Sequence, residues 1–68
     1  MDRRFQDFTH VALTRSVDTE GVHMPEGTHG VVMAAYADGL AYEVEFDEPR
    51  HVVLTIEGKD LRRERMAA

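Results

Sequence analysis

The stretch that decides the fold is PEGTHGVV at residues 25–32, with ADGL at 37–40 and YEVEF at 42–46 behind it. Pro25 fixes φ and lies two residues before Gly27, which predicts a sharp turn. Residues 30–35 form the strand that follows, and their small side chains indicate close backbone approach or strong curvature. Asp38-Gly39 then predicts a type I′ hairpin turn, because that turn needs positive φ angles.

The strand after this hairpin turn alternates cleanly between the two faces of a sheet. Such alternation is typical of a half-buried antiparallel strand. One face is predicted to hold Leu40, Tyr42, Val44 and Phe46, and the other Ala41, Glu43, Glu45 and Asp47. Tyr42 therefore belongs to the core, with its hydroxyl reaching the rim.

Apolar alternation places two more strands at residues 8–13 and 51–57. Phe5 and Phe8 are expected to cover the core or a sheet edge. Residues 58–61 predict a short 3-10 turn in which Leu61 closes one end of the fold, and residues 62–68 a charged tail, helical or disordered. The predicted core consists of Val11, Leu13, Val32, Tyr42, Val44, Phe46, Leu54 and Ile56, with Val52 on the same face.

Residues 14–27 are predicted to be a long connection without strands, because they are polar and irregular. Val22 and Met24 are expected to pin it to the core. Connections of this length are unusual in compact domains and are often functional.

Sixty-eight residues make one domain. Short strands with one long connection favour a bent sheet that closes on itself, since closure removes exposed edges. The sequence therefore predicts an all-β domain, a small five-stranded SH3-like barrel over residues 8–61 with charged termini.

The composition narrows the class of protein. The chain has no cysteine, which excludes disulfides and thiolate zinc sites, so self-association becomes a more favoured means of support. No apolar run approaches the roughly 20 residues of a membrane span, and the two arginines near the N-terminus lack the apolar segment of a signal peptide. The expected compartment is the cytoplasm, with no membrane association.

Charge is unevenly distributed along the chain. Residues 7–60 carry eleven acidic and three basic side chains, a charge of −8, whereas the two ends together carry +3. The positive charge comes from Arg3, Arg4, Arg62, Arg63 and Arg65. An acidic body should repel a phosphate backbone, so nucleic-acid binding is not expected beyond weak attraction to the ends.

With these segments in place, the chain resembles a group of short bacterial proteins catalogued as domain-of-unknown-function family 4926. The resemblance rests on VALT at 11–14, GTHGVV at 27–32, YEVEF at 42–46, VVLTI at 52–56 and DL at 60–61, and spans residues 8–61. It implies an SH3-like barrel. It brings no established activity, cofactor or catalytic residue.

A shorter similarity links the turn around Gly27 and Gly30 to the KOW motif of ribosomal and transcription-elongation proteins, which bind RNA or protein. It covers about 10 residues, and its glycines also let the backbone turn into a curved strand. KOW segments tend to be basic here, whereas this chain has Glu26 and His29. A KOW-like nucleic-acid accessory domain is the alternative function.

The reactive side chains form no recognisable catalytic or metal motif. The histidines lack the spacings of metal-binding motifs, although His23 and His29 flank the Pro-Gly turn and could approach each other near Glu20 or Glu26. No cysteine or Gly-x-Ser-x-Gly nucleophile exists. We therefore expect no enzyme activity, cofactor or native metal site.

The most favoured function is a non-catalytic protein-interaction module, whose partner is another protein or a second copy. SH3-like barrels often bind extended peptides beside an aromatic and acidic patch. The long connection and the acidic hairpin supply the candidate surface. Its predicted binding residues are Glu20, His23, Glu26, His29, Tyr36, Asp38 and Glu43.

Overall fold

The chain is an all-β domain, and the computed structural model describes its residues 4–65. Its strands within that range are β1 (His10–Leu13), β2 (Val17–Thr19), β3 (Val22–Met24), β4 (His29–Tyr36), β5 (Ala41–Phe46), β6 (Val52–Glu57) and β7 (Leu61–Arg63). Two 3-10 turns complete the described part, η1 (Ala37–Gly39) between β4 and β5 and η2 (Gly58–Asp60) before β7.

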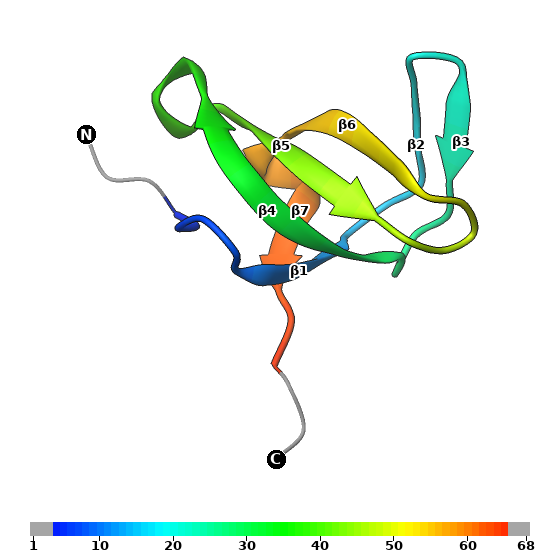
Figure 1. The fold of residues 1–68 in the computed structure, drawn as a ribbon, viewed down its shortest axis with the longest axis horizontal. Helices are drawn as coiled ribbons and strands as arrows, with labels where there is room; N and C mark the ends of the chain where they lie inside the picture. The colour runs from blue at the N-terminus through cyan, green and yellow to red at the C-terminus, as the bar shows by residue number, and fades with distance from the viewer. Residues whose placement is uncertain (1–3, 66–68) are drawn as a thin grey trace.

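Five of the strands form one antiparallel sheet in the order β6-β5-β4-β1-β7, and β2 pairs only with β3 in a separate ribbon. Figure 1 shows this ribbon standing beside the sheet, next to β6. Within residues 4–65 the outer strands β6 and β7 do not pair with each other. The predicted closed barrel is therefore not what the pairing shows: the sheet is open, and the β2–β3 ribbon covers it beside β6.

The predicted core is confirmed. All eight predicted residues are at most 2% exposed, and they pack in one cluster. The cluster also contains Phe5 and Met24, each at most 2% exposed, as expected from the sequence for a cover of the core and for a residue that pins the long connection. Leu61 is also buried, at the start of β7 directly after the predicted 3-10 turn.

The register explains how β4 keeps its apolar residues inside. Val32 lies opposite Val44, and Ala35 lies opposite Tyr42, with a register shift between Val32 and Ala34. This bulge places one extra residue, Met33, on β4 and increases local twist. Without the shift, the residues of β4 after Met33 would place their apolar side chains on the outer face of the sheet and their exposed ones in the core.

The hairpin turn has the predicted geometry. Asp38 has φ 57° and ψ 33°, Gly39 has φ 94°, and the Leu40 N–H donates to the Ala37 carbonyl at 3.2 Å. These are the two central positions of a type I′ turn. Leu40 corrects the prediction, because it lies in the four-residue loop after Tyr36 and is 76% exposed.

We expect Gly39→Ala to lower the free energy of unfolding by about 1 kcal/mol, since a Cβ at this positive φ is strained. Thermal melting followed by circular dichroism measures the effect. Leu40→Ala is the matched control at the next position, where φ is −69°. Equal melting temperatures for Gly39→Ala and wild type would contradict the assigned turn.

The long connection is not strand-free, which corrects the sequence prediction. Val17 pairs with Met24 and Thr19 with Val22, so that the connection folds into the β2–β3 ribbon. Glu20 and Gly21 form its tip at φ 54° and 78°, the positive angles of a type I′ hairpin. Asp18 and His23 face outward across the ribbon and their side chains lie 2.7 Å apart.

The predicted charged tail also contains a strand. Arg62 and Arg63 belong to β7, which pairs with β1 along Val11–Leu13. Three residues with two arginines carry little strand signal, so the pairing comes from tertiary contact with β1. Arg65 is exposed, and residues 66–68 and Arg3 lie outside the described residues.

The segment before β1 is fixed on Tyr42. The buried Tyr42 hydroxyl accepts the backbone N–H groups of Arg4 at 3.0 Å and Phe5 at 3.3 Å. The rings of Phe5 and Tyr42 meet edge to face at 5.3 Å. Phe5 thus covers the core as predicted, whereas Phe8 is 68% exposed and does not.

Candidate binding crevice

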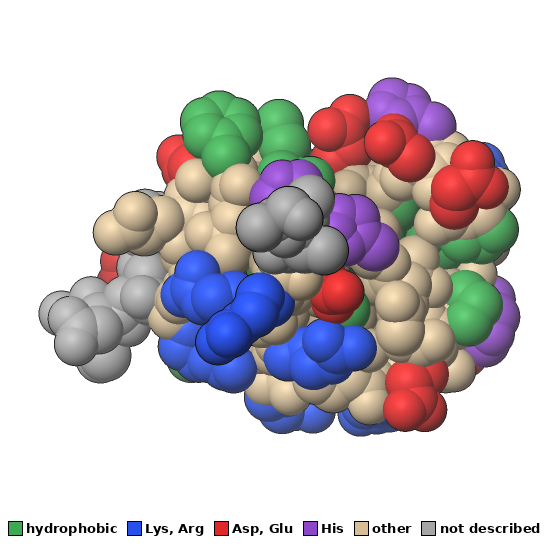
Figure 2. All heavy atoms as spheres, turned by 90° about the horizontal axis from the view of Figure 1, so that it is seen from below, with side chains coloured by type: hydrophobic (Ala, Val, Ile, Leu, Met, Phe, Trp, Pro, Cys, Tyr) green, Lys and Arg blue, Asp and Glu red, His purple; other side chains and the backbone are tan. Residues whose placement is uncertain are grey.

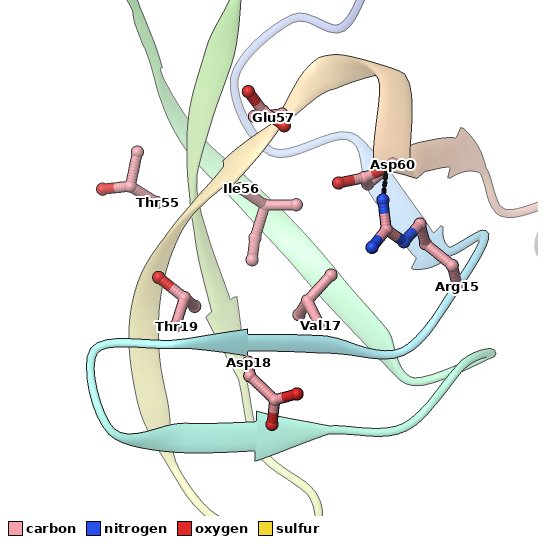
Figure 3. Close-up of a pocket in the computed structure, with 8 residues that line it drawn as sticks. All are labelled: Arg15, Val17, Asp18, Thr19, Thr55, Ile56, Glu57 and Asp60. Carbon is pink, nitrogen blue, oxygen red and sulfur yellow. Dashed lines mark ion pairs between the residues drawn. The ribbon is translucent and has the colours of Figure 1, made fainter.

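An open crevice lies where the β2–β3 ribbon meets β6 and η2. It holds about 280 Å³. Figure 3 shows Val17 of β2 pointing toward Ile56 of β6, with Thr19 beside it. The residues that line it are Arg15, Val17, Asp18, Thr19, Thr55, Ile56, Glu57 and Asp60. The crevice thus combines an apolar floor with polar and acidic walls.

Asp60 is the buried acid of the crevice, 7% exposed as a residue, at the end of η2. One of its carboxylate oxygens lies 3.7 Å from Arg15 Nη1, the contact drawn in Figure 3, and 3.7 Å from Lys59 Nζ. Lys59 also lies 3.3 Å from Glu57. The two cations, Arg15 and Lys59, partly balance Asp60 and Glu57, and Glu57 stays largely accessible. The Asp18 side chain projects from β2 away from Ile56 in Figure 3 and pairs with His23.

Two further hollows continue the crevice in both directions. A second one, also of about 280 Å³, follows the ribbon from Asp18 and Thr19 to its tip and to His23. A third, of about 410 Å³, shares Glu57 with the first and reaches Leu40 beside η1. Together they form a line of shared residues from the ribbon tip, past the end of β6, to the exposed Leu40 side chain.

Glu20 ties the ribbon tip to the sheet. Its carboxylate accepts the backbone N–H of Thr55 at 3.2 Å, across 35 residues of sequence. β6 is an outer strand of the sheet, so this N–H points away from β5 and would otherwise be open to strand pairing. Glu20 therefore holds the ribbon in place and satisfies a donor on an exposed edge.

The structure distributes the predicted binding residues over three places. Glu20 and His23 line the hollow along the ribbon. Glu26 lies on the connection into β4, where its N–H donates to Ser16 Oγ at 3.1 Å, and His29 is the first residue of β4 and contacts His10. His23 binds Asp18 instead of approaching His29, so the pair considered from the sequence does not converge.

Tyr36, Asp38 and Glu43 gather around the β4–β5 hairpin. Tyr36 is 59% exposed and pairs with Ala41, while Glu43 pairs with Ala34, so the Tyr36 and Glu43 side chains share the outward face of the sheet. Glu43 is half-buried and accepts the Thr55 hydroxyl at 2.8 Å. Glu43 and Glu20 therefore both hydrogen-bond Thr55, which also lines the crevice.

His51, a histidine paired with acidic side chains, lies at the turn between β5 and β6. His51 Nε2 is 2.7 Å from Glu45 and 3.9 Å from Asp47. The hydrogen bond to Glu45, aided by the charges of Glu45 and Asp47, raises the pKa of His51 above its ordinary value of 6.5.

The expected pH effect follows from this direction. Because the pKa is raised in the folded state, the ion pair contributes stability below the unfolded pKa of about 6.5 and loses it as pH rises through the folded value. We expect the His51 ring to titrate above 6.5 in an NMR titration and Glu45→Gln to lower its midpoint. A midpoint that Glu45→Gln leaves unchanged would contradict the assigned cause.

Arginines from the two ends of the chain meet on another surface. Arg63 Nη2 donates to the Arg4 carbonyl at 3.2 Å, and both guanidinium groups lie over the Phe5 ring, at 4.8 Å for Arg4 and 5.7 Å for Arg63. Figure 2 shows the molecule from below relative to Figure 1, with Lys and Arg side chains gathered on one side of the view. Arg4 also donates to the carbonyls of Gly58 and Leu61, so it anchors the segment before β1 to η2 and β7.

Sequence reasoning missed the residues that build the crevice from β2, β6 and η2. Thr19, Glu57 and Asp60 carry no motif, and they meet only because the ribbon covers the sheet beside β6. One signal was present: apolar or β-branched residues alternate on both sides of Gly21, at 17, 19, 22 and 24. That pattern indicates a short hairpin.

The chain was compared with protein families, curated proteins and solved structures, and no match was found in any of the three comparisons. Within residues 4–65, no helix is long and apolar enough to cross a membrane.

Proposed function

We propose that this chain is a non-catalytic protein-interaction module that binds an extended, basic peptide segment in the crevice between the β2–β3 ribbon, β6 and η2. The observation that carries the proposal is the line of three adjoining hollows, linked through Asp18, Thr19 and Glu57. A ligand in this line touches residues from the ribbon tip to η1. That shape suits an extended chain.

The size and lining of the crevice favour a peptide over a small molecule. Sites for small molecules are mostly apolar, of about 300–1,000 Å³, and bury most of the ligand. Here each hollow is open and the crevice itself is mainly polar, while the apolar contacts are spaced: Val22 in the ribbon hollow, Val17 and Ile56 in the crevice, and the exposed Leu40 in the third hollow. Spaced apolar contacts along a groove suit alternate side chains of an extended peptide.

The charge of the chain and of the hollows indicates which kind of partner would bind. Residues 7–60 carry a charge of −8. The three hollows together present Asp18, Glu20, Glu57 and Asp60 against Arg4, Arg15 and Lys59. Acidic walls attract and orient a basic partner, mainly through the rate of association. A segment with spaced Lys or Arg residues and apolar residues between them matches this lining.

The same function is supported by the fold class that we propose for the chain. We place the chain among SH3-like barrels, with the β2–β3 ribbon as the long connection after the first strand and η2 as the short turn before the last. The resemblance to domain-of-unknown-function family 4926 belongs to the same proposal. SH3-like domains bind peptides in such grooves, and this is an argument from fold alone.

The proposal is tested by selecting binders from a phage-displayed library of random dodecapeptides against the tag-free chain. We expect enriched sequences with repeated basic residues. Glu57→Lys should weaken a selected peptide by about tenfold, because it reverses charge in two of the hollows. Glu48→Lys, the same charge change in the exposed turn before β6, should leave affinity within about twofold.

Two outcomes would contradict the proposal. The first is that no peptide is enriched. The second is that Glu57→Lys and Glu48→Lys lose affinity equally, which would mean that the peptide is attracted to the acidic chain as a whole and not to the crevice. Sedimentation of the chain alone accompanies the test, because a second copy is the other partner predicted from the sequence.

A second candidate function rests on the arginine surface. Arg4 and Arg63 meet over Phe5 and suit a KOW-like contact with a nucleic-acid backbone. With an acidic body, we expect only weak binding that vanishes near 150 mM salt, where screening acts within about 8 Å. Fluorescence anisotropy with labelled RNA and DNA measures it. Submicromolar affinity at that salt, lost in Arg63→Gln, would favour this function over the peptide crevice.

A further inference from the structure

His10 of β1 and His29 of β4 form a pair of imidazoles outside the crevice. Their Nδ1 and Nε2 atoms lie 3.1 Å apart, and their rings are stacked at 30° with centroids 5.2 Å apart. The strand register explains the approach: His10 lies opposite Val31 and His29 opposite Ala12, so the two side chains are diagonal neighbours on one sheet face. We propose that this pair is a binding site for a borderline divalent cation, with Zn²⁺ as the physiological candidate.

The first argument is the distance between the nitrogens. With metal–nitrogen bonds of about 2.0–2.1 Å, two ligands at angles between 90° and tetrahedral have nitrogens about 2.9–3.4 Å apart. The observed 3.1 Å lies inside that range. A cation bonded to both nitrogens at this separation lies off the line that joins them, so each ring turns toward it while the two strands stay in place.

The second argument is the direction of the rings. Two imidazoles that converge on one metal with these bonds have ring centroids about 4.5–5.2 Å apart, farther than their nitrogens. The observed centroid separation is 5.2 Å, against 3.1 Å for the nitrogens. The two nitrogens thus lie between the rings, as they do both in a direct hydrogen bond and in a pair of ligands to one cation, so the centroid separation is compatible with a shared cation.

The scaffold supports a preorganised site. β1 lies between β4 and β7, and β4 lies between β5 and β1, so both strands are paired on both sides. Sites built on such strands hold their geometry better than sites on loops. Imidazole ligands favour Zn²⁺, Cu²⁺ and Ni²⁺, whereas Mg²⁺ and Ca²⁺ prefer oxygen. Two protein ligands leave the other coordination positions to water or to a partner's side chain.

No pattern in the sequence indicates this pair, since His10 and His29 are 19 residues apart and match no metal motif. Another candidate cluster is Glu45, Asp47 and His51 at the β5–β6 turn, whose ligand atoms lie within 4.8 Å of one another. It belongs to an exposed turn, and His51 is already engaged by Glu45. The two clusters use different histidines, so substitution separates them.

The experiment titrates the tag-free full-length chain with ZnCl₂ at pH 7.5, reading the imidazole signals by NMR and the affinity by calorimetry. We expect the His10 and His29 rings to shift together, and MgCl₂ to shift neither. His10→Gln or His29→Gln should each weaken Zn²⁺ binding by about tenfold or more, because a single imidazole lacks the chelating second donor.

His23→Gln and His51→Gln are the matched controls, and both should bind Zn²⁺ as wild type does. The backbone amide spectrum confirms that each variant is folded. Unchanged affinity in folded His10→Gln and His29→Gln would overturn the proposal. Loss of affinity confined to His51→Gln would also overturn it, and would assign the cation to the turn cluster.

Discussion

Phe46→Ala is expected to cost about 3–5 kcal/mol of folding free energy, the largest effect of any single truncation considered for this chain. Phe46 is fully buried and lies on β5 between Gly30 of β4 and Val52 of β6. A 68-residue domain has a total stability of only about 3–10 kcal/mol. The variant should therefore be largely unfolded.

Urea unfolding and the dispersion of the amide spectrum measure this effect. Val53→Ala is the matched control: it lies next to Val52 on β6, is 46% exposed, and should change stability by no more than about 0.5 kcal/mol. A Phe46→Ala variant that stays folded with a dispersed spectrum would contradict the inward assignment of β5.

Gly30→Ala is expected to cost about 1–3 kcal/mol through overpacking. A Cβ on Gly30 would lie 2.7 Å from Val44 Cγ1 and 2.9 Å from two carbons of the Phe46 ring. The backbone conformation of Gly30 is open to other residues, so the cost is one of space. Gly30, predicted from the sequence to allow close approach of the backbone, thus packs directly against the Val44 and Phe46 side chains of the core.

A double-mutant cycle with Val44→Ala isolates this clash. Val44→Ala removes the methyl group nearest the new Cβ, so Gly30→Ala should cost less in that background. Gly27→Ala is the contrasting control, with free space around its Cβ but φ at +86°, and its cost comes from backbone strain alone. Equal costs of Gly30→Ala in both backgrounds would contradict the packing argument.

Local patterns predicted much of the fold. The alternation of Tyr42, Val44 and Phe46 identified the buried face of β5, and Asp38-Gly39 identified its turn. Both depend on residues close in sequence, where side-chain period and turn chemistry act directly. The 3-10 turn before Leu61 was predicted for the same reason.

The errors concern segments whose structure depends on distant partners. The β2–β3 ribbon is short and polar, and it is held by Met24 in the core and by Glu20 on Thr55. β7 exists because β1 offers an unpaired edge to Arg62 and Arg63. Tertiary contact outweighs weak strand propensity at both places.

The candidate sites were less predictable than the fold. The long connection was singled out from the sequence as a candidate surface, but the crevice also needs Glu57 and Asp60, some forty residues further along the chain. The His10–His29 pair depends on the β1–β4 register. Neither arrangement follows from spacing within the sequence.

Peptide binding in the crevice can be mapped residue by residue from the amide shifts of the ¹⁵N-labelled chain while a selected basic peptide is titrated into it. We expect the largest changes at Thr19, Thr55, Glu57 and Leu40, along the line of hollows, with Arg63 unchanged. Changes confined to the arginine surface, or spread evenly over the acidic residues, would contradict it.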